Sequence, residues 1–158
     1  ALLRDPYVVV VPSGEPCPDF SESRPDLPFL RYSSEQHIGR QIEAQLNRLR
    51  IQLPHRMSAE SNQALMTMVA AGQGWTISTA TCFTRAKSLW HGLSLHPFPR
   101  AQFAREIALI TVPGSATILA EMLESMLRAL IRSRTLEPAV AQVPFLEDHF
   151  VMLNSDLS

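Results

Sequence analysis

The stretch Ser61-Asn-Gln-Ala-Leu-Met-Thr-Met-Val-Ala-Ala-Gly-Gln-Gly-Trp-Thr-Ile-Ser-Thr79 decides how this chain folds. Gly72 stands where a left-handed helix C-cap would fall, and Gly74 frees a turn into the β-prone run Trp75-Thr76-Ile77. The pattern predicts a helix, a glycine turn and a strand. The apolar positions expected in the helix recur at helical spacing: Ala64, Leu65, Met68, Val69 and Ala71.

A tight glycine turn brings backbone N–H groups to the edge of a sheet with little side-chain bulk in the way. A small ligand could therefore approach them closely. A pair of glycines is a weak motif, however, and the same residues could serve only to close an α/β unit. Both interpretations stay open from this stretch alone.

The composition is that of an ordinary globular protein. Of the 158 residues, 46% are hydrophobic and 18% charged, and the net charge of −1 offers no positive field for nucleic-acid phosphates. Cys17 and Cys82 lack neighbours at metal-ligand spacing, so we expect no metal, no cofactor, no disulfide framework and a reduced, cytoplasmic compartment. No stretch approaches the roughly 18 consecutive apolar residues of a membrane span, and residues 1–6 do not have the charged start and long apolar run that are typical of a signal peptide.

The first strand is predicted from the β-branched run Tyr7-Val-Val-Val-Val11 between two prolines, a pattern typical of burial on both faces in a parallel or mixed sheet. The chain starts without Met, almost directly in this strand. We therefore expect an earlier part to be missing, although N-terminal processing would leave the same start. Residues 12–28 are rich in proline and predict an irregular connection between two lobes.

A second unit is predicted downstream of this connection. Residues 28–32 form a short strand, Ser33-Ser34 stand at a helix N-cap, and Ser33 and Gln36 have capping-box spacing. Residues 55–60 are expected to be extended. The intervening helix, which ends before Pro54, carries one apolar stripe: Ile38, Ile42, Leu46 and Leu49.

The remaining elements continue the alternation of strands and helices that is typical of an α/β fold. We expect a short helix or loop at residues 83–92, strands at 93–97 and 105–112, and a long helix capped by Ser115. Residues 137–158 have no strong period, so their structure is not predicted. The long helix has a wide apolar face that must pack against something substantial: Ile118, Leu119, Met122, Leu123, Met126, Leu127, Leu130 and Ile131.

Two helix starts carry the candidate binding residues. The hydroxyls and backbone N–H groups of Arg31-Tyr32-Ser33-Ser34 favour a carboxylate, sulfate or phosphate, to which Arg31 could add a bidentate pair. Ser58, Glu60 and Ser61 repeat the arrangement at the next helix. Simple capping accounts for the serines equally well.

Other polar and aromatic residues give weaker signals. Trp75 could wall a pocket or lie in the core, and residues 78–81 are polar enough to line a pocket. The histidines are scattered, and Asp and Glu are dispersed, so no acid, base, nucleophile or metal cluster can be assembled. The sequence therefore favours a binding protein over an enzyme.

Two segments stand in an order and spacing that resemble the effector-binding domain of LysR-type transcriptional regulators. They are Leu27-Pro-Phe-Leu-Arg-Tyr-Ser-Ser34, followed by Ile38-Gly-Arg-Gln-Ile-Glu43, and Leu65-Met-Thr-Met-Val-Ala-Ala-Gly-Gln-Gly-Trp-Thr-Ile77. The resemblance covers roughly residues 5–134. Where the family often has Pro after the post-glycine strand, this chain has Ser78-Thr79. The family's winged helix-turn-helix, linker helix and opening part of the first lobe are absent.

The resemblance implies an α/β, two-lobed fold like that of type 2 periplasmic binding proteins, with the second lobe largely complete and the first partial. Residues 1–12 would be a crossover strand of the first lobe, 13–104 the second lobe, 105–136 the returning strand and helix, and 137–158 a C-terminal tail. It also implies the residues of the ligand cleft: Arg31, Tyr32, Ser33, Ser34, Ser58, Ser61, Trp75 and Thr76.

The function implied is ligand sensing in a bacterial regulator. A small, anionic effector would bind between the lobes of a cytoplasmic homo-oligomer and control DNA binding through the absent N-terminal module, with no membrane partner. A solute-binding protein of a transport system shares the fold and is the main alternative. An enzyme on the same scaffold is a second alternative, without a catalytic constellation to support it.

Overall fold

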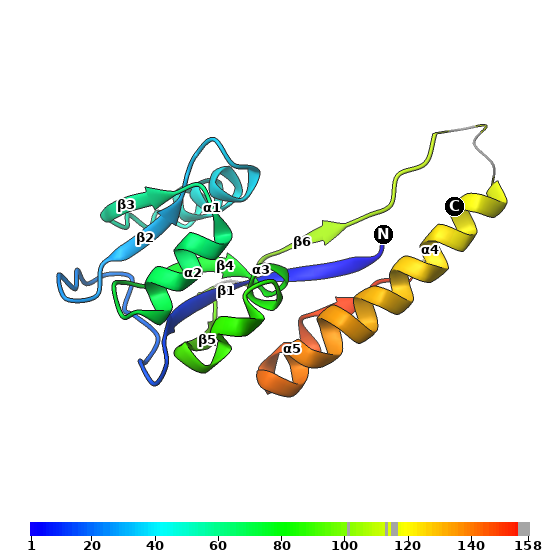
Figure 1. Cartoon of the computed structure of the whole chain (residues 1–158). Helices are drawn as coiled ribbons and strands as arrows, with labels where there is room; N and C mark the ends of the chain where they lie inside the picture. Colours follow the sequence, from blue (N-terminus) through cyan, green and yellow to red (C-terminus); the bar gives the residue numbers. More distant parts are fainter. Residues whose placement is uncertain (101, 113, 115–116, 155–158) are drawn as a thin grey trace.

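The computed structural model describes residues 1–100, 102–112, 114 and 117–154, and it has an α/β architecture. Strand β1 (Leu3–Pro12) runs through the middle of the main sheet (Figure 1). β4 and β5 flank its second half, and β6 and β7 flank its first half. Within the described residues, β1 is antiparallel to each of these neighbours: β4 (Thr76–Thr79), β5 (Leu93–Pro97), β6 (Ala104–Ile107) and β7 (Val151–Met152).

The predicted strand at residues 7–11 is confirmed, and β1 extends beyond it at both ends. The side chains of residues 8–11, all valines, are completely buried. The sequence predicted a parallel or mixed sheet around this strand, and in the described residues β1 itself is antiparallel to each of its neighbours. A continuous apolar run reports burial on both faces of a sheet, and a central antiparallel strand covered by other elements is buried in the same way.

Helix α2 (Asn62–Ala70) packs against β1. The predicted order of helix, glycine turn and strand is confirmed, because α2 is followed by a turn at Gly72 and then by β4. The buried residues of the helix are Leu65, Met66 and Val69, and the predicted apolar positions include the first and third of them. Of the other predicted positions, Ala64 and Ala71 are exposed and Met68 is half-buried.

The two glycines of the turn have different physical roles. Gly72 has a φ of +77°, and it closes the helix because its N–H donates to the carbonyl of Val69 at 2.9 Å. Gly74 allows a close approach to the neighbouring strand. A Cβ atom there would lie 2.6 Å from Leu30 Cγ and would also meet the carbonyl oxygen of Pro28.

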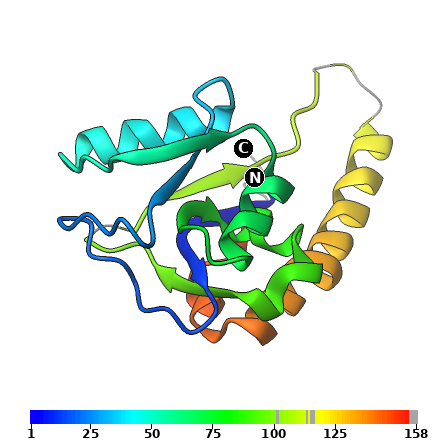
Figure 2. The same ribbon diagram turned by 60° about the vertical axis from the view of Figure 1, so that its left-hand side comes forward.

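A second, parallel sheet consists of β2 (Phe29–Tyr32) and β3 (His55–Ala59), connected by α1 (His37–Arg48). An isolated parallel bridge between Phe29 and Trp75 joins it to the main sheet. Figure 2 shows α1 lying alongside β3 on one side of the molecule. The predicted strand, extended segment and helix are confirmed. The stripe Ile38, Ile42 and Leu46 is buried as expected, with Leu49 half-buried after the helix end.

The predicted start of this helix is wrong. Its N-cap is Gln36, and within the described residues no side-chain hydrogen bond caps it. The reason is that Ser33 directly follows β2 and is still hydrogen-bonded to β3, since its N–H donates to the carbonyl of Ala59 at 2.9 Å. Residues 33–36 then form a turn in which Gln36 N–H donates to the Ser33 carbonyl at 3.0 Å. Neither Ser33 nor Ser34 is a helix cap.

Residues 80–112 follow the predicted order with one correction. Residues 83–92 span the end of α3 (Ala80–Thr84) and the 3₁₀ helix η1 (Lys87–Gly92), and β5 matches the predicted strand at 93–97. The strand predicted at 105–112 is shorter, because β6 ends at Ile107 where its pairing with Leu3 ends. Residues 108–112 lie outside the strand.

The C-terminal region forms a continuous helical segment and a last strand. It comprises α4 (Thr117–Ile131), the π-helix η2 (Arg132–Leu136), α5 (Glu137–Gln142) and the 3₁₀ helix η3 (Pro144–Asp148), before β7. The predicted cap Ser115 lies outside the described residues. The region that had no predicted structure is anchored to the core by the fully buried residues Ala139, Leu146 and Phe150.

The apolar face of α4 is largely exposed. The expectation that it packs against other elements is met only by Leu127 and Ile131, which contact the core from half-buried positions. The other six residues are between 45% and 75% exposed: Ile118, Leu119, Met122, Leu123, Met126 and Leu130. Arg128 fastens the helix beside the chain start, donating to the carbonyls of Ala1 and Leu153.

None of the helices in the described ranges combines the length and hydrophobicity needed to cross a membrane.

Gly74→Ala should lower the free energy of unfolding by about 1–3 kcal/mol, because the added methyl group meets the backbone of Pro28 and the side chain of Leu30. Gln73→Ala is the matched control, since Gln73 is exposed, and it should change stability by less than about 0.5 kcal/mol. Urea denaturation of both variants measures the difference. Equal stabilities would contradict the close approach at Gly74.

Candidate functional site

A polar cavity of about 600 Å³ lies where two parallel strands end and their following helices begin. The carboxyl ends of parallel strands and the starts of the following helices meet at one edge of a sheet, which is a common place for ligand binding in α/β folds. Residues of β2, α1, α2, α3 and β6, and of the caps and turns next to them, form its wall: Tyr32, Gln36, His37, Ile38, Glu60, Ser61, Asn62, Gln63, Cys82, Arg85 and Arg105.

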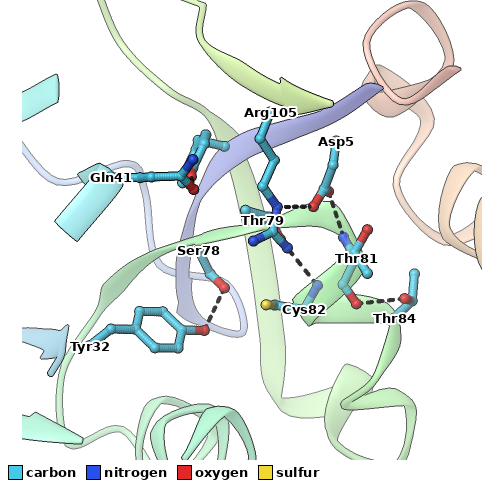
Figure 3. A network of polar contacts seen from close by, with 10 residues as sticks. Asp5, Tyr32, Gln41, Ser78, Thr79, Thr81, Cys82, Thr84 and Arg105 are labelled. Carbon is cyan, nitrogen blue, oxygen red and sulfur yellow. Dashed lines mark hydrogen bonds and ion pairs between the residues drawn. The ribbon is translucent and has the colours of Figure 1, made fainter. Parts of the chain in front are cut away.

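Tyr32 connects three elements at the base of this cavity. Its hydroxyl donates to Asn62 Oδ1 at 2.7 Å. The same oxygen lies 2.7 Å from Ser78 Oγ (Figure 3), and because the phenol has only one proton, the serine hydroxyl is the donor in this contact. Asn62 Nδ2 in turn donates to the carbonyl of Cys82 at 3.0 Å. Burial raises the pKa of Tyr32 far above its ordinary value. The phenol is therefore a neutral, fixed hydrogen-bonding group.

An ion pair between Asp5 and Arg105 supplies another residue of the wall, Arg105. Asp5 on β1 is completely buried, and its Oδ2 accepts from Arg105 Nε on β6 at 2.9 Å. Its Oδ1 accepts from the N–H of Thr81 at 2.9 Å, so both carboxylate oxygens are used (Figure 3). Burial would lower the pKa of Arg105, but the charge and hydrogen bond of Asp5 raise it above its ordinary value. Arg105 is therefore permanently charged.

The starts of the two helices differ. Ser61 caps α2, since its hydroxyl accepts from the N–H of Ala64 at 3.3 Å. Helix α1 has no such cap among the described residues, and His37 and Ile38 of its first turn lie in the cavity wall. The side-chain amide of Gln36 donates to the carbonyl of Glu60 and holds the two starts together. Uncapped N–H groups and the positive helix end favour a negatively charged ligand group there.

Two of the eight residues proposed from the sequence, Tyr32 and Ser61, lie in the cavity wall. Ser33 and Ser34 follow Tyr32 but lie outside the wall. Arg31 lies on the opposite face of β2, because successive strand residues point to opposite sides. It forms an ion pair with Glu43 at 3.5 Å.

The other three residues also lie elsewhere. Ser58 is exposed on β3. Trp75 is buried and packs against Phe20 and Phe29, with ring centroids 5.1 and 4.9 Å away. Thr76 is completely buried, and its hydroxyl donates to the carbonyl of Leu30 at 2.7 Å. The structure therefore does not bring the eight residues together in one cavity.

Residues 78–81, which were expected to line a pocket, are also absent from this wall. Ser78 and Thr79 are completely buried behind it. Sequence reasoning missed Asp5 and Arg105 as site residues, although a signal for Asp5 was present. An acidic residue at the start of an apolar, buried strand requires a cationic or hydrogen-bonding partner.

The described residues contain no group of three or more His, Cys, Asp or Glu side chains that could hold a metal ion. In the same part of the chain Cys17 and Cys82 are free thiols. The chemistry that this wall offers is hydrogen bonding and charge pairing.

Residues 1–132 match the family model described as the LysR substrate binding domain. No match was found among curated proteins.

Several solved structures are similar to this chain. A cysteine mutant of OxyR from Corynebacterium glutamicum is 25% identical, with a TM-score of 0.56, and the match covers 87% of this chain and 43% of that one. HypT from Salmonella typhimurium, a hypochlorite-specific LysR-type transcriptional regulator, is 18% identical, with a TM-score of 0.54 and coverages of 82% and 45%. The effector binding domain of QuiR in complex with shikimate is also 18% identical, with a TM-score of 0.51 and coverages of 66% and 50%. This chain thus spans about half the length of these structures.

Raising the pH of the folded chain should deprotonate its two tyrosines, Tyr7 and Tyr32, in two separate steps. Burial raises the pKa of Tyr7 to about 12, and its hydroxyl donates to Gln41. Phenolate absorbance should therefore rise well above pH 10 in the folded chain and near pH 10 in urea. Because the folded state holds these protons more tightly, stability should be complete below pH 10 and should fall as the pH rises towards 12.

Tyr7→Phe should remove the lower of the two native titration steps, and Tyr32→Phe should leave that step in place. Native titration of both phenols near pH 10 would contradict their burial.

Proposed function

This chain belongs to the LysR substrate binding domain family, and from that premise we propose that it is the ligand-sensing domain of a bacterial LysR-type transcriptional regulator. Domains of this family are regulatory and bind small-molecule effectors. The effector would bind in the cavity at the starts of α1 and α2. The α/β, two-lobed fold class predicted from the sequence is confirmed by the family match and the solved relatives.

The observation that carries this proposal is the cavity of about 600 Å³ with a wall of fixed polar groups. Its volume is within the range of pockets that bind small molecules. Tyr32 and Asn62 are held in place by each other and by Ser78 and Cys82, so the wall is preformed. QuiR binds shikimate in its effector domain, a ligand of the size that such a cavity accommodates.

The charges of the wall support an anionic effector. Arg85 and Arg105 contribute positive charge, and Glu60 is the opposing carboxylate. The uncapped start of α1 adds a partial positive charge. Of the eight ligand-binding residues predicted from the sequence, Tyr32 and Ser61 belong to this site. The wall offers no catalytic constellation, and we propose no enzymatic role.

The remaining parts of the assignment are also proposals. Control of DNA binding would require a winged helix-turn-helix outside this sequence, and the regulator would act as a cytoplasmic homo-oligomer. We keep the proposed division into residues 1–12, 13–104, 105–136 and 137–158. Strands β1 and β6 would then be the crossovers between lobes, consistent with their mutual pairing next to the cavity.

Gln63→Trp should block effector binding, because residue 63 lies in the cavity wall and an indole would occupy much of the space. A panel of small organic acids that includes shikimate would be screened with the purified chain by thermal shift and calorimetry. Any ligand found should bind the variant at least about tenfold more weakly, which corresponds to about 1.4 kcal/mol.

Ala64→Trp is the matched control, since the neighbouring residue 64 is exposed on the same helix and lies outside the cavity wall. It should leave the affinity unchanged. Ligands that bind Gln63→Trp as tightly as the original chain would place the effector site elsewhere.

A further inference from the structure

The cavity wall contains a cation whose orientation is fixed by a strand pair. Asp5 and Arg105 are direct register partners in the antiparallel pair of β1 and β6. Because Asp5 binds the Nε atom of Arg105, the two terminal nitrogens of the guanidinium remain for other partners. Nη2 reaches Thr79 Oγ1 only at 3.4 Å, and Nη1 has no hydrogen-bond partner among the described residues.

Arg105 therefore has more donors than the folded chain uses. A single positive charge is enough to neutralise Asp5. A guanidinium has in addition five N–H donors, which form a rigid fork that matches the two oxygens of a carboxylate. The side chain is 24% exposed, and this exposed part belongs to the cavity wall. An anion there would find a preoriented, partly desolvated partner.

The other charged groups of the wall are less suited to this role. His37, Glu60 and Arg85 are all exposed to solvent, so water and salt screen their charges. Among the described residues, none of them has a buried counter-charge that fixes its orientation. Arg105 is the cation of the wall with both partial burial and a fixed position.

We propose that Arg105, positioned by Asp5, binds the anionic group of the effector and transmits its binding to the paired strands β1 and β6. The inference rests on the proposed function and assigns one residue to the ligand's charge. Asp5 is a positioning residue, since its carboxylate contacts Arg105 rather than the cavity.

The same carboxylate provides the route of transmission. Asp5 also accepts from the N–H of Thr81 in the first turn of α3, whose neighbour Cys82 lies in the cavity wall. An anion that draws the guanidinium towards the cavity changes the Nε contact with Asp5, and with it the contact with Thr81. Binding of an anion at Arg105 therefore changes side-chain contacts of β1, β6 and α3 together.

The test is a nuclear magnetic resonance titration of the purified chain with sulfate and benzoate, at constant ionic strength, and with benzamide as the neutral analogue of benzoate. Both anions should shift the Nε–Hε signal of Arg105 and the amide signal of Thr81 saturably, and benzamide should leave both unchanged. Benzoate should bind at least about tenfold more tightly than benzamide, as expected for a charge-assisted, bidentate contact.

Three variants separate binding from folding. Arg105→Lys keeps the charge but loses the fork, and should weaken benzoate binding about tenfold. The double variant Asp5→Asn with Arg105→Gln replaces the ion pair by two neutral amides, which avoids leaving a buried charge unpaired. It should fold and lose the preference for benzoate over benzamide. Arg56→Gln is the matched control, since Arg56 is exposed on β3 and lies outside the cavity wall, and it should keep that preference.

The proposal is overturned if neither anion shifts the Arg105 signal, or if the folded double variant still prefers benzoate. Failure of this inference is distinguishable from failure of the proposed function. If Gln63→Trp prevents a ligand from binding but the Arg105 variants do not affect that ligand, the cavity remains the effector site and Arg105 is not part of it. A ligand that Gln63→Trp does not exclude would contradict the cavity itself.

Discussion

The burial of β1 is the constraint on which the rest of the structure depends. Its valines at positions 8–11 are completely removed from solvent, and each contributes about 1.5–3 kcal/mol of hydrophobic stabilisation. Backbone groups buried with them must be hydrogen-bonded, because an unpaired buried amide is costly. The strand meets this requirement by pairing along both halves, with β4 and β5 around residues 7–12 and with β6 and β7 around residues 3–6. Segments from residues 76 to 152 are thereby assembled on one central strand.

Burial of the same strand creates the need for a charge partner at its first half. Asp5 is as buried as the valines, and a carboxylate without compensation would be strongly destabilising there. Arg105 and the N–H of Thr81 supply that compensation, and each comes from an element that also forms the cavity. The polar site is therefore connected to the core through a structural requirement of β1.

Sequence reasoning recovered most of the elements and only part of the site. Helix α2, its glycine turn and β4 were predicted because Gly72 and Gly74 are local signals for a left-handed cap and a close approach. The start of α1 was misplaced because Ser33, a good capping residue by type, is still hydrogen-bonded to β3, a strand that lies more than twenty residues later. Arg31 and Tyr32 were assigned to one cleft, but the alternation of side chains along β2 separates them.

By itself the sequence determined which family the chain resembles, the order of most strands and helices up to α4, and which strand is buried, since these follow from local spacing of apolar residues, glycines and prolines. Tertiary structure decided the antiparallel pairing of β1, the place of residues 137–154 beside it and the membership of the cavity wall. The physical reason is distance along the chain. Asp5 and Arg105 are a hundred residues apart, and their contact exists only because two strands pair in one register. Local sequence patterns predict which residues are buried and where helices are capped. The register of a strand and the strands with which it pairs depend on packing and hydrogen bonding in the whole fold.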